Sequence, residues 1–255
     1  MPPIGRSVSG MERNAQHPDL TALEDAGFRR VLIVVAHPDD AEYGTSAAVA
    51  NWTSRGIEVG YLLLTAGEAG MQRPPEEAGP LRRSEQQEAC RIVGVEHLAI
   101  LDFPDGVVEY GLPLRRAIAR EIRSFQPDAV LCGAGELHTP WGIDHADHRA
   151  AGVATIDAVR DADNRWVFRE LLAEGLEPWG AAWLLLTGTA PTHFVELNAD
   201  DEQRAVASLT AHEAYLADLP WHPKPEEFIP DMLKQQGELC GVDRALTLTA
   251  HRLRN

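Results

Sequence analysis

Two short clusters of histidine and carboxylate side chains hold the chemistry that this sequence offers. The first, His37-Pro38-Asp39-Asp40, directly follows the aliphatic run 31–35, and the second is Asp144-His145-Ala146-Asp147-His148. Imidazole nitrogens and carboxylate oxygens are ligands that zinc accepts, and the remaining groups could transfer protons. A capping aspartate beside an ordinary surface histidine would give the same pattern, so each cluster alone is ambiguous.

The segments around the clusters predict how the clusters could meet. The run 31–35 is typical of a strand buried on both faces, and Pro38 should end it. We expect strands at 30–36, 57–65, 97–102 and 128–132, and helices at 41–55, 81–93, 112–125 and 145–160. Such alternation favours an α/β fold, a Rossmann-like open parallel sheet flanked by helices.

The remaining segments predict the domain organisation. Residues 1–27 are expected to form a flexible N-terminal arm with one short helix at 20–26. A single domain would follow over 28–255, with a core at 28–160 and a C-terminal α/β extension at 161–255. The extension should contain strands at 182–187 and 193–197 and helices at 200–216 and 226–238. Residues 66–80, rich in glycine and proline, predict a long loop that selects the substrate.

The predicted topology brings the two clusters together. Ligands of open parallel sheets bind at the carboxyl ends of the strands, where the strand order reverses. If the first four strands have the order 3-2-1-4, both clusters face that crevice. His37, Asp40 and His148 would then form a site with two histidines and one carboxylate, which leaves a position open for water as in catalytic zinc sites. Asp39 and His145 stay available for proton transfer.

Asp147 has an expected role beside the second cluster. We expect its carboxylate to hold the imidazole of His145 and to favour the charged form of that ring.

Together the clusters resemble the LmbE-like (PIG-L-like) metal-dependent deacetylases, which act on N-acetylglucosamine units. The resemblance is carried by Ala36-His37-Pro38-Asp39-Asp40-Ala41-Glu42 and by His145-Ala146-Asp147-His148. It extends to Thr65-Ala66-Gly67-Glu68, Arg82-Arg83-Ser84-Glu85 and Phe103-Pro104-Asp105-Gly106. Residues 30–160 resemble the family well and the remainder loosely, through Pro191-Thr192-His193 and Ala211-His212.

The resemblance implies a role for each candidate residue. His37, Asp40 and His148 would bind zinc, or iron in the cell. Asp39 would be the general base that activates the attacking water. His145, supported by Asp147, would stabilise the oxyanion and protonate the leaving amine. Arg82 matches a position that contacts substrate in some members.

The implied enzyme is a zinc-dependent hydrolase of a linear amide bond. It would remove the acetyl group from an N-acetylated amino sugar or glycoconjugate: a thiol precursor, a chitobiose-like sugar or an antibiotic intermediate. Ile143 stands where some sugar deacetylases have a tyrosine that assists the oxyanion, which leaves the identity of the substrate open.

Composition restricts the partners. The 255 residues have a net charge of −16, which argues against nucleic acid and anionic membranes as partners. The cysteines, Cys90, Cys132 and Cys240, are far apart and form no CxxC pair, as expected for a reducing, cytoplasmic setting. No signal peptide or transmembrane helix is predicted. The expected partner is a small N-acyl sugar, and homo-oligomerisation is left open.

Two alternatives compete with a deacetylase. His37, Asp39 and His148 also resemble the facial triad of non-haem iron oxygenases, although those sites usually occur on all-β folds. A catalytically silent relative could instead serve as a binding module in a biosynthetic pathway. The roles of His138, Trp141, His193 and His212 are open between lining the pocket and packing.

Overall fold

The computed structural model describes residues 20–139 and 142–254. Its central sheet has eight strands in the order β1-β9-β10-β8-β5-β2-β3-β4. These strands are β1 Thr21–Ala22, β2 Arg30–Val35, β3 Glu58–Leu63, β4 His97–Ile100, β5 Ala129–Gly133, β8 Trp183–Thr187, β9 His193–Glu196 and β10 Ala245–Arg252. A separate hairpin pairs β6 His138–Thr139 with β7 Gly142–Ile143.

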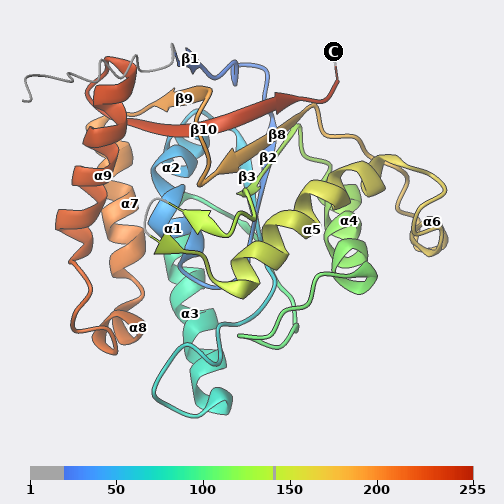
Figure 1. The fold of residues 1–255 in the computed structure, drawn as a ribbon, viewed down its shortest axis with the longest axis horizontal. Coiled ribbons are helices and arrows are strands. Elements are labelled where there is room, and N and C mark those ends of the chain that lie inside the picture. Colours follow the sequence, from blue (N-terminus) through green and yellow to red (C-terminus); the bar gives the residue numbers. More distant parts are fainter. Residues whose placement is uncertain (1–19, 140–141, 255) are drawn as a thin grey trace, which may run out of the picture.

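Helices cover both faces of this sheet (Figure 1). The helices are α1 Asp40–Gly44, α2 Ser46–Ser54, α3 Pro75–Val93, α4 Leu112–Phe125, α5 Ala146–Asp163, α6 Glu170–Ala173, α7 Ala199–Thr210, α8 Glu213–Ala217 and α9 Pro225–Cys240. One hydrophobic cluster joins α2, α3, α7 and α9 to one face of the sheet, and a second joins α4 and α5 to the other. The predicted α/β class with an open, mostly parallel sheet is therefore confirmed.

Strand β2 shows why the aliphatic run is needed. Val31 and Ile33 point into the hydrophobic cluster that contains α2, α3, α7 and α9, while Leu32 and Val34 point into the one that contains α4 and α5. Alternate side chains of a strand face opposite sides, so a strand covered on both faces must be apolar throughout. β2 pairs in parallel with β3 and β5. The first four expected strands correspond to β2, β3, β4 and β5. Read from β4, their order in the sheet is β4-β3-β2-β5, which is the supposed order 3-2-1-4. This order places the ends of β2 and β5 side by side.

Several predicted boundaries were wrong for local reasons. The helix expected at 41–55 is divided into α1 and α2 at Thr45, where φ is −131°. The loop expected to end at residue 80 ends earlier, because Pro75 begins α3 at a position that tolerates proline. The helix expected at 200–216 is likewise divided into α7 and α8.

The chain ends pack differently from the expectation. Residues 1–19 of the predicted arm lie outside the described residues. In the remainder, residues 21–22 form β1 beside β9 instead of the helix expected at 20–26, and Leu23 is buried. The C-terminal segments extend the same sheet, and the unpredicted β10 inserts antiparallel between β8 and β9. No helix among the described residues is long and apolar enough to span a bilayer.

Candidate active site

The histidine–carboxylate cluster His37-Pro38-Asp39-Asp40 forms a tight turn at the carboxyl end of β2. Asp40 Oδ2 accepts hydrogen bonds from the main-chain N–H groups of Ala36 (3.1 Å) and His37 (2.8 Å). Asp39 has φ 83°, in the left-handed region that aspartate adopts more readily than most residues. Its own N–H donates to Gln86 Oε1 at 3.0 Å. The turn thereby separates the two carboxylates, with Asp40 among the histidines and Asp39 outside that group.

Three side chains form a candidate metal site. His37, Asp40 and His148 each offer one ligand atom, and these atoms lie within 4.8 Å of one another. His148 Nε2 is 3.1 Å from Asp40 Oδ1, and His37 Nδ1 is 3.5 Å from Asp40 Oδ2. Two imidazoles and one carboxylate fit a catalytic zinc centre. The topology therefore brings together the three predicted ligands, which come from the turn after β2, from α1 and from α5.

Further carboxylates hold the far nitrogen of each histidine in this group. His148 Nδ1 is 2.9 Å from Asp144 Oδ1, and His37 Nε2 is 3.0 Å from Asp105 Oδ1. Such partners fix the ring orientation and tautomer of metal-binding histidines. Each imidazole therefore keeps its other nitrogen free to face Asp40, which supports the fit of these residues to a divalent cation.

The electrostatics of the three side chains also favour a cation. Burial lowers the pKa of His37, but the charges of Asp40 and Asp105 outweigh burial and raise it to about 11. The pKa of His148 rises to about 9 because Asp40 and Asp144 outweigh burial in the same way. Burial raises the pKa of Asp40, yet His148 and His37 bring it well below its ordinary value. The carboxylates here thus stabilise positive charge, which a metal ion would supply in place of protons.

Asp39 is paired with Arg82 instead. Arg82 Nη2 donates to Asp39 Oδ1 (2.9 Å) and to the carbonyl of Pro38 (2.6 Å), and both side chains of the ion pair are 3% exposed. Burial raises the pKa of Asp39 to about 6, although Arg82 opposes the shift. Asp39 Oδ2 has no hydrogen-bond partner among the described residues. One oxygen is therefore fixed by Arg82, and the other is buried with an unused acceptor position.

Arg82 occupies a different environment from the predicted substrate contact. Besides Asp39 and Pro38, it donates to the carbonyl of Gly67 (3.1 Å), and its guanidinium lies 4.0 Å from the ring centre of Tyr215. These contacts engage both terminal nitrogens with the protein. The geometry therefore favours Arg82 as the residue that positions Asp39.

Among the described residues the carboxylate of Asp147 makes no hydrogen bond to His145, although His37, His145 and Asp147 offer ligand atoms within 4.8 Å of one another. The carboxylate of Asp147, fully buried, accepts hydrogen bonds from the main chain of Gly106 (2.7 Å) and Val108 (3.1 Å), and lies 3.2 Å from His37 Nε2. The main-chain N–H of Asp147 donates to His145 Nδ1 (3.3 Å). Because His145 caps α5, Nδ1 of its ring faces the main chain of the first helical turn.

The facial triad proposed for an iron oxygenase is not assembled. The compact group of ligand atoms contains Asp40, whereas the carboxylate of Asp39 is bound to Arg82. The residue that would complete the oxygenase triad thus lies outside the group formed by His37 and His148.

A cavity of about 320 Å³ adjoins the candidate metal site. Its walls are formed by His37, Asp39, Asp40, Tyr43, Ala69, Gly70, Arg82, Asp105, Gly106, His145, His148 and Tyr215. Tyr43, Asp105 and Tyr215 belong to this wall although the sequence predicted no role for them. Asp105 could have been found, because it follows a third parallel strand as the clusters follow the first and fourth. Nothing in the local sequence marks Tyr215, which reaches the cavity from α8.

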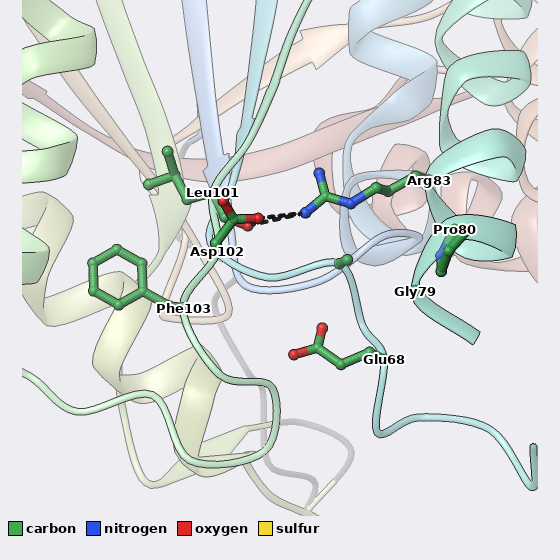
Figure 2. A pocket seen from close by; sticks show the side chains of 8 residues that line it. Glu68, Gly79, Pro80, Arg83, Leu101, Asp102 and Phe103 are labelled. Carbon is green, nitrogen blue, oxygen red and sulfur yellow. Dashed lines mark hydrogen bonds and ion pairs between the residues drawn. The ribbon is translucent and has the colours of Figure 1, made fainter. Parts of the chain in front are cut away.

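The loop after β3 separates this cavity from a second one of about 220 Å³. Figure 2 shows Glu68 on this loop facing the second cavity, below the ion pair of Arg83 with Asp102 (2.8 Å). Glu68 Oε1 accepts the N–H of Asp105 (3.1 Å), and Asp105 Oδ2 accepts the N–H of Ala69 (2.7 Å). The loop is thereby braced against the residue that holds His37.

The histidines whose roles were open lie in different environments. His212 is fully buried, with Nε2 3.7 Å from Glu42 Oε2, and its pKa is raised because the interactions with Glu42 outweigh burial. Its position is that of a packed residue beneath the site.

The other open positions lie away from this buried pair. His193, the first residue of β9, forms a side-chain hydrogen bond with the hydroxyl of Thr192. His138 is exposed on β6, and Ile143 is 72% exposed on β7. Trp141 lies outside the described residues.

Comparisons with known proteins agree with this site. The profile of the family described as "PIG-L: GlcNAc-PI de-N-acetylase" matches residues 32–159, half of the chain. The diacetylchitobiose deacetylase of Thermococcus kodakarensis is 31% identical over 199 residues, which cover 76% of this chain and 72% of that protein. The 1D-myo-inositol 2-acetamido-2-deoxy-alpha-D-glucopyranoside deacetylase of Thermomonospora curvata is 29% identical, over 64% of this chain and 61% of that protein.

A solved structure extends the similarity to most of the fold. The N,N'-diacetylchitobiose deacetylase of Pyrococcus horikoshii, in complex with an inhibitor, superposes with a TM-score of 0.81 at 25% identity. The match covers 94% of this chain and 88% of that one. The resemblance noted in the sequence is therefore confirmed, and the three relatives described here are named deacetylases of N-acetylated sugar compounds.

Proposed function

Because this chain belongs to the PIG-L (GlcNAc-PI de-N-acetylase) family, we propose that it is a zinc-dependent N-deacetylase of an N-acetylated amino sugar or glycoconjugate. The observation that carries the proposal is the separation of Asp39 from Asp40 at one turn. Asp40 lies with His37 and His148, while Asp39 keeps one free oxygen beside the same cavity. Family membership supports an amide hydrolase, and this geometry supports its dependence on a metal.

His37, Asp40 and His148 would hold the zinc ion. When bound there, zinc polarises a carbonyl and makes water more acidic. Asp39 accepts the proton of the attacking water through Oδ2 while Arg82 holds Oδ1 in place. A pKa of about 6 suits this role, because a base works best when its pKa is near the working pH.

His145 serves the oxyanion. Its Nδ1 accepts the N–H of Asp147, so the neutral ring carries its proton on Nε2. From the cavity wall that N–H stabilises the oxyanion formed when water adds to the acetamide carbonyl. Breakage of the C–N bond then releases acetate and the amine, to which Asp39 returns the proton that it took from the water. Asp147 contributes by accepting the main-chain N–H of Gly106 and so fixing that turn.

We infer a small-molecule substrate, a cytoplasmic location, and no nucleic-acid or membrane partner, from the acidic composition and the scattered cysteines. A single domain over residues 28–255 is supported by the continuity of the eight-stranded sheet.

Substitution of Asp39 tests the proposal. Asp39→Asn should retain bound metal and lose activity by roughly 10²–10⁴-fold, because the amide cannot accept the proton. Metal analysis and acetate release from N-acetyl sugars measure the two effects. Asp102→Asn makes the same change at a carboxylate that is 93% exposed, and it should behave as wild type.

Two results would contradict the proposal. Full activity in Asp39→Asn would remove Asp39 from the role of base. Wild-type protein that binds no metal and releases no acetate from any N-acetyl sugar would instead favour the silent binding module.

A further inference from the structure

Two side chains of α3 hold opposite ends of one peptide bond in the turn after β2. This bond joins Pro38 to Asp39. Its carbonyl oxygen, on Pro38, accepts a hydrogen bond from Arg82 Nη2 (2.6 Å). Its N–H group, on Asp39, donates to Gln86 Oε1 (3.0 Å). Arg82 and Gln86 are both buried and four residues apart, so they lie on one face of the helix. We call this pair the peptide clamp.

The peptide clamp holds the peptide plane that sets the conformation of Asp39. Rotation of this plane changes the φ angle of Asp39, which is 83°. This left-handed region is uncommon for residues that carry a side chain, although aspartate tolerates it. In this conformation the carboxylate of Asp39 meets Arg82, while that of Asp40 meets the two histidines of the metal site. Loss of a hold on the plane would let it rotate and would move the carboxylate of Asp39.

The side-chain amide of Gln86 is itself fixed from its other end. Gln86 Nε2 donates to Glu42 Oε1 at 3.2 Å. Only the NH₂ end of an amide can donate, so the carbonyl oxygen of Gln86 is left to face the N–H of Asp39. Glu42 Oε2 lies 3.7 Å from Nε2 of His212, the residue that precedes α8, and neither side chain is exposed. Buried groups of α1 and α8 therefore set the orientation of Gln86.

Gln86 does not reach the reacting groups. The catalytic cavity is lined by Asp39 and Arg82 of this network but not by Gln86. The carboxylate of Asp40 is also held independently, by the main-chain N–H groups of Ala36 and His37. Any effect of Gln86 on the reaction must therefore pass through Asp39.

We propose that Gln86 is a positioning residue for deacetylation, which holds the main-chain N–H of Asp39 and thereby keeps the carboxylate of Asp39 where it can take the proton of the attacking water. This inference rests on the deacetylase function proposed above. It separates two tasks of the peptide clamp: Arg82 holds the carboxylate directly, and Gln86 holds the main chain that carries it.

Gln86→Met tests the proposal, because methionine has a similar length but no carbonyl oxygen to accept the N–H of Asp39. The kcat for acetate release should fall about 10–100-fold, since a displacement of about 1 Å at the reacting groups can cost that much. KM and the bound zinc should stay within about twofold of wild type, because the cavity lining and the three metal ligands are unchanged. A merely structural residue would lower the urea midpoint and leave the kcat of the folded protein unaltered.

Gln87→Met is the matched control. Gln87 is the next residue of α3 and is exposed, so the same substitution there removes no contact with the turn after β2. This variant should keep the kcat, the KM and the bound zinc of wild type.

Hydrogen exchange tests the peptide clamp without turnover. In wild-type protein the N–H of Asp39 should exchange slowly by NMR, because it is buried and hydrogen-bonded. In Gln86→Met it should exchange about tenfold faster, the change expected for the loss of one buried hydrogen bond. The main-chain N–H groups of β2 should be unaffected. This measurement needs no substrate, so wild-type protein that released no acetate would contradict the deacetylase function while the clamp was still tested.

Three outcomes would overturn the inference. One is equal kcat in Gln86→Met and in a wild-type protein that releases acetate, which would leave the deacetylase function intact. Another is a raised KM with unchanged kcat, which would assign Gln86 to substrate binding. The third is fast exchange of the Asp39 N–H in wild-type protein, which would show that the clamp does not form even if Gln86→Met failed to fold.

Discussion

Asp144 and Asp105 show how single carboxylates outside the metal-binding group can control it. Each holds the far nitrogen of one histidine, Asp144 that of His148 and Asp105 that of His37. Asp105 is held in turn by the N–H of Ala69 and the hydroxyl of Thr65. The orientation of both rings is therefore fixed by the protein before any ion binds, which reduces the cost of forming the site.

Removal of Asp144 should weaken metal binding without removing a ligand. We expect Asp144→Ala to lower zinc affinity about 10–100-fold, because His148 loses the partner that fixes its tautomer. Competition with a chromophoric chelator measures this affinity. Asp157→Ala removes the same charge from α5, where the carboxylate is 40% exposed and bonds Tyr110, so it should bind zinc as wild type does. Equal affinities in the two variants would refute a role for Asp144.

At this scale the sequence predicts ligands better than their supporting residues. His37, Asp40 and His148 stand out because their types and spacing belong to metal chemistry. Their supporting contacts depend on where loops return in space. Arg82 is an example, because the family resemblance suggests contact with substrate, whereas the buried side chain is paired with Asp39. Tyr215 could not be predicted, since it reaches the site only through the packing of α8 beside α3.

At the level of secondary structure, hydrogen bonds join the turn 103–108 to the first turn of α5. The buried carboxylate of Asp147, in the first turn of α5, accepts two main-chain hydrogen bonds from Gly106 and Val108. Without this carboxylate, two N–H groups beside the cavity would lose their acceptor. Asp105, which holds His37, is adjacent to Gly106. The hydrogen bonds of Asp147 to this turn therefore also help to fix the orientation of His37, a candidate metal ligand.

Asp147→Ala should therefore destabilise the protein as well as reduce its activity. We expect the free energy of unfolding to fall by about 2–4 kcal/mol, because hydrogen bonds to a charged group contribute about 1.5–3 kcal/mol each and are not fully additive. Urea denaturation followed by circular dichroism measures the change. Asp147→Asn, which keeps one acceptor oxygen, should lose less stability. Reduced activity with unchanged stability in Asp147→Ala would instead favour the side-chain pairing with His145 that the sequence suggested.

Across the whole molecule, a single sheet connects the site to the C-terminal segments. The alternation of strands and helices predicts a parallel sheet, and the observed order of β2, β3, β4 and β5 is the 3-2-1-4 order that we supposed for it. The position of β10 was not, because an antiparallel strand inserted between β8 and β9 depends on long-range pairing that leaves no local pattern. Residues 245–252 therefore complete a core that begins at residue 23.

This continuity predicts that the protein unfolds as one unit. Leu248 on β10 is 1% exposed and belongs to the hydrophobic cluster that contains Val31 and Ile33 of β2. Leu248→Ala should lower the free energy of unfolding by about 2–5 kcal/mol, the usual cost of a cavity in a packed core. Leu239→Ala, the same change at a site 38% exposed, should cost about 0.5 kcal/mol or less.

The circular dichroism signal and the deacetylase activity, both followed in urea, should be lost in one transition. The midpoints of the two curves should shift equally in Leu248→Ala. If activity persisted after the C-terminal segments had unfolded, residues 161–255 would be a separate domain, because a shared sheet requires one cooperative transition.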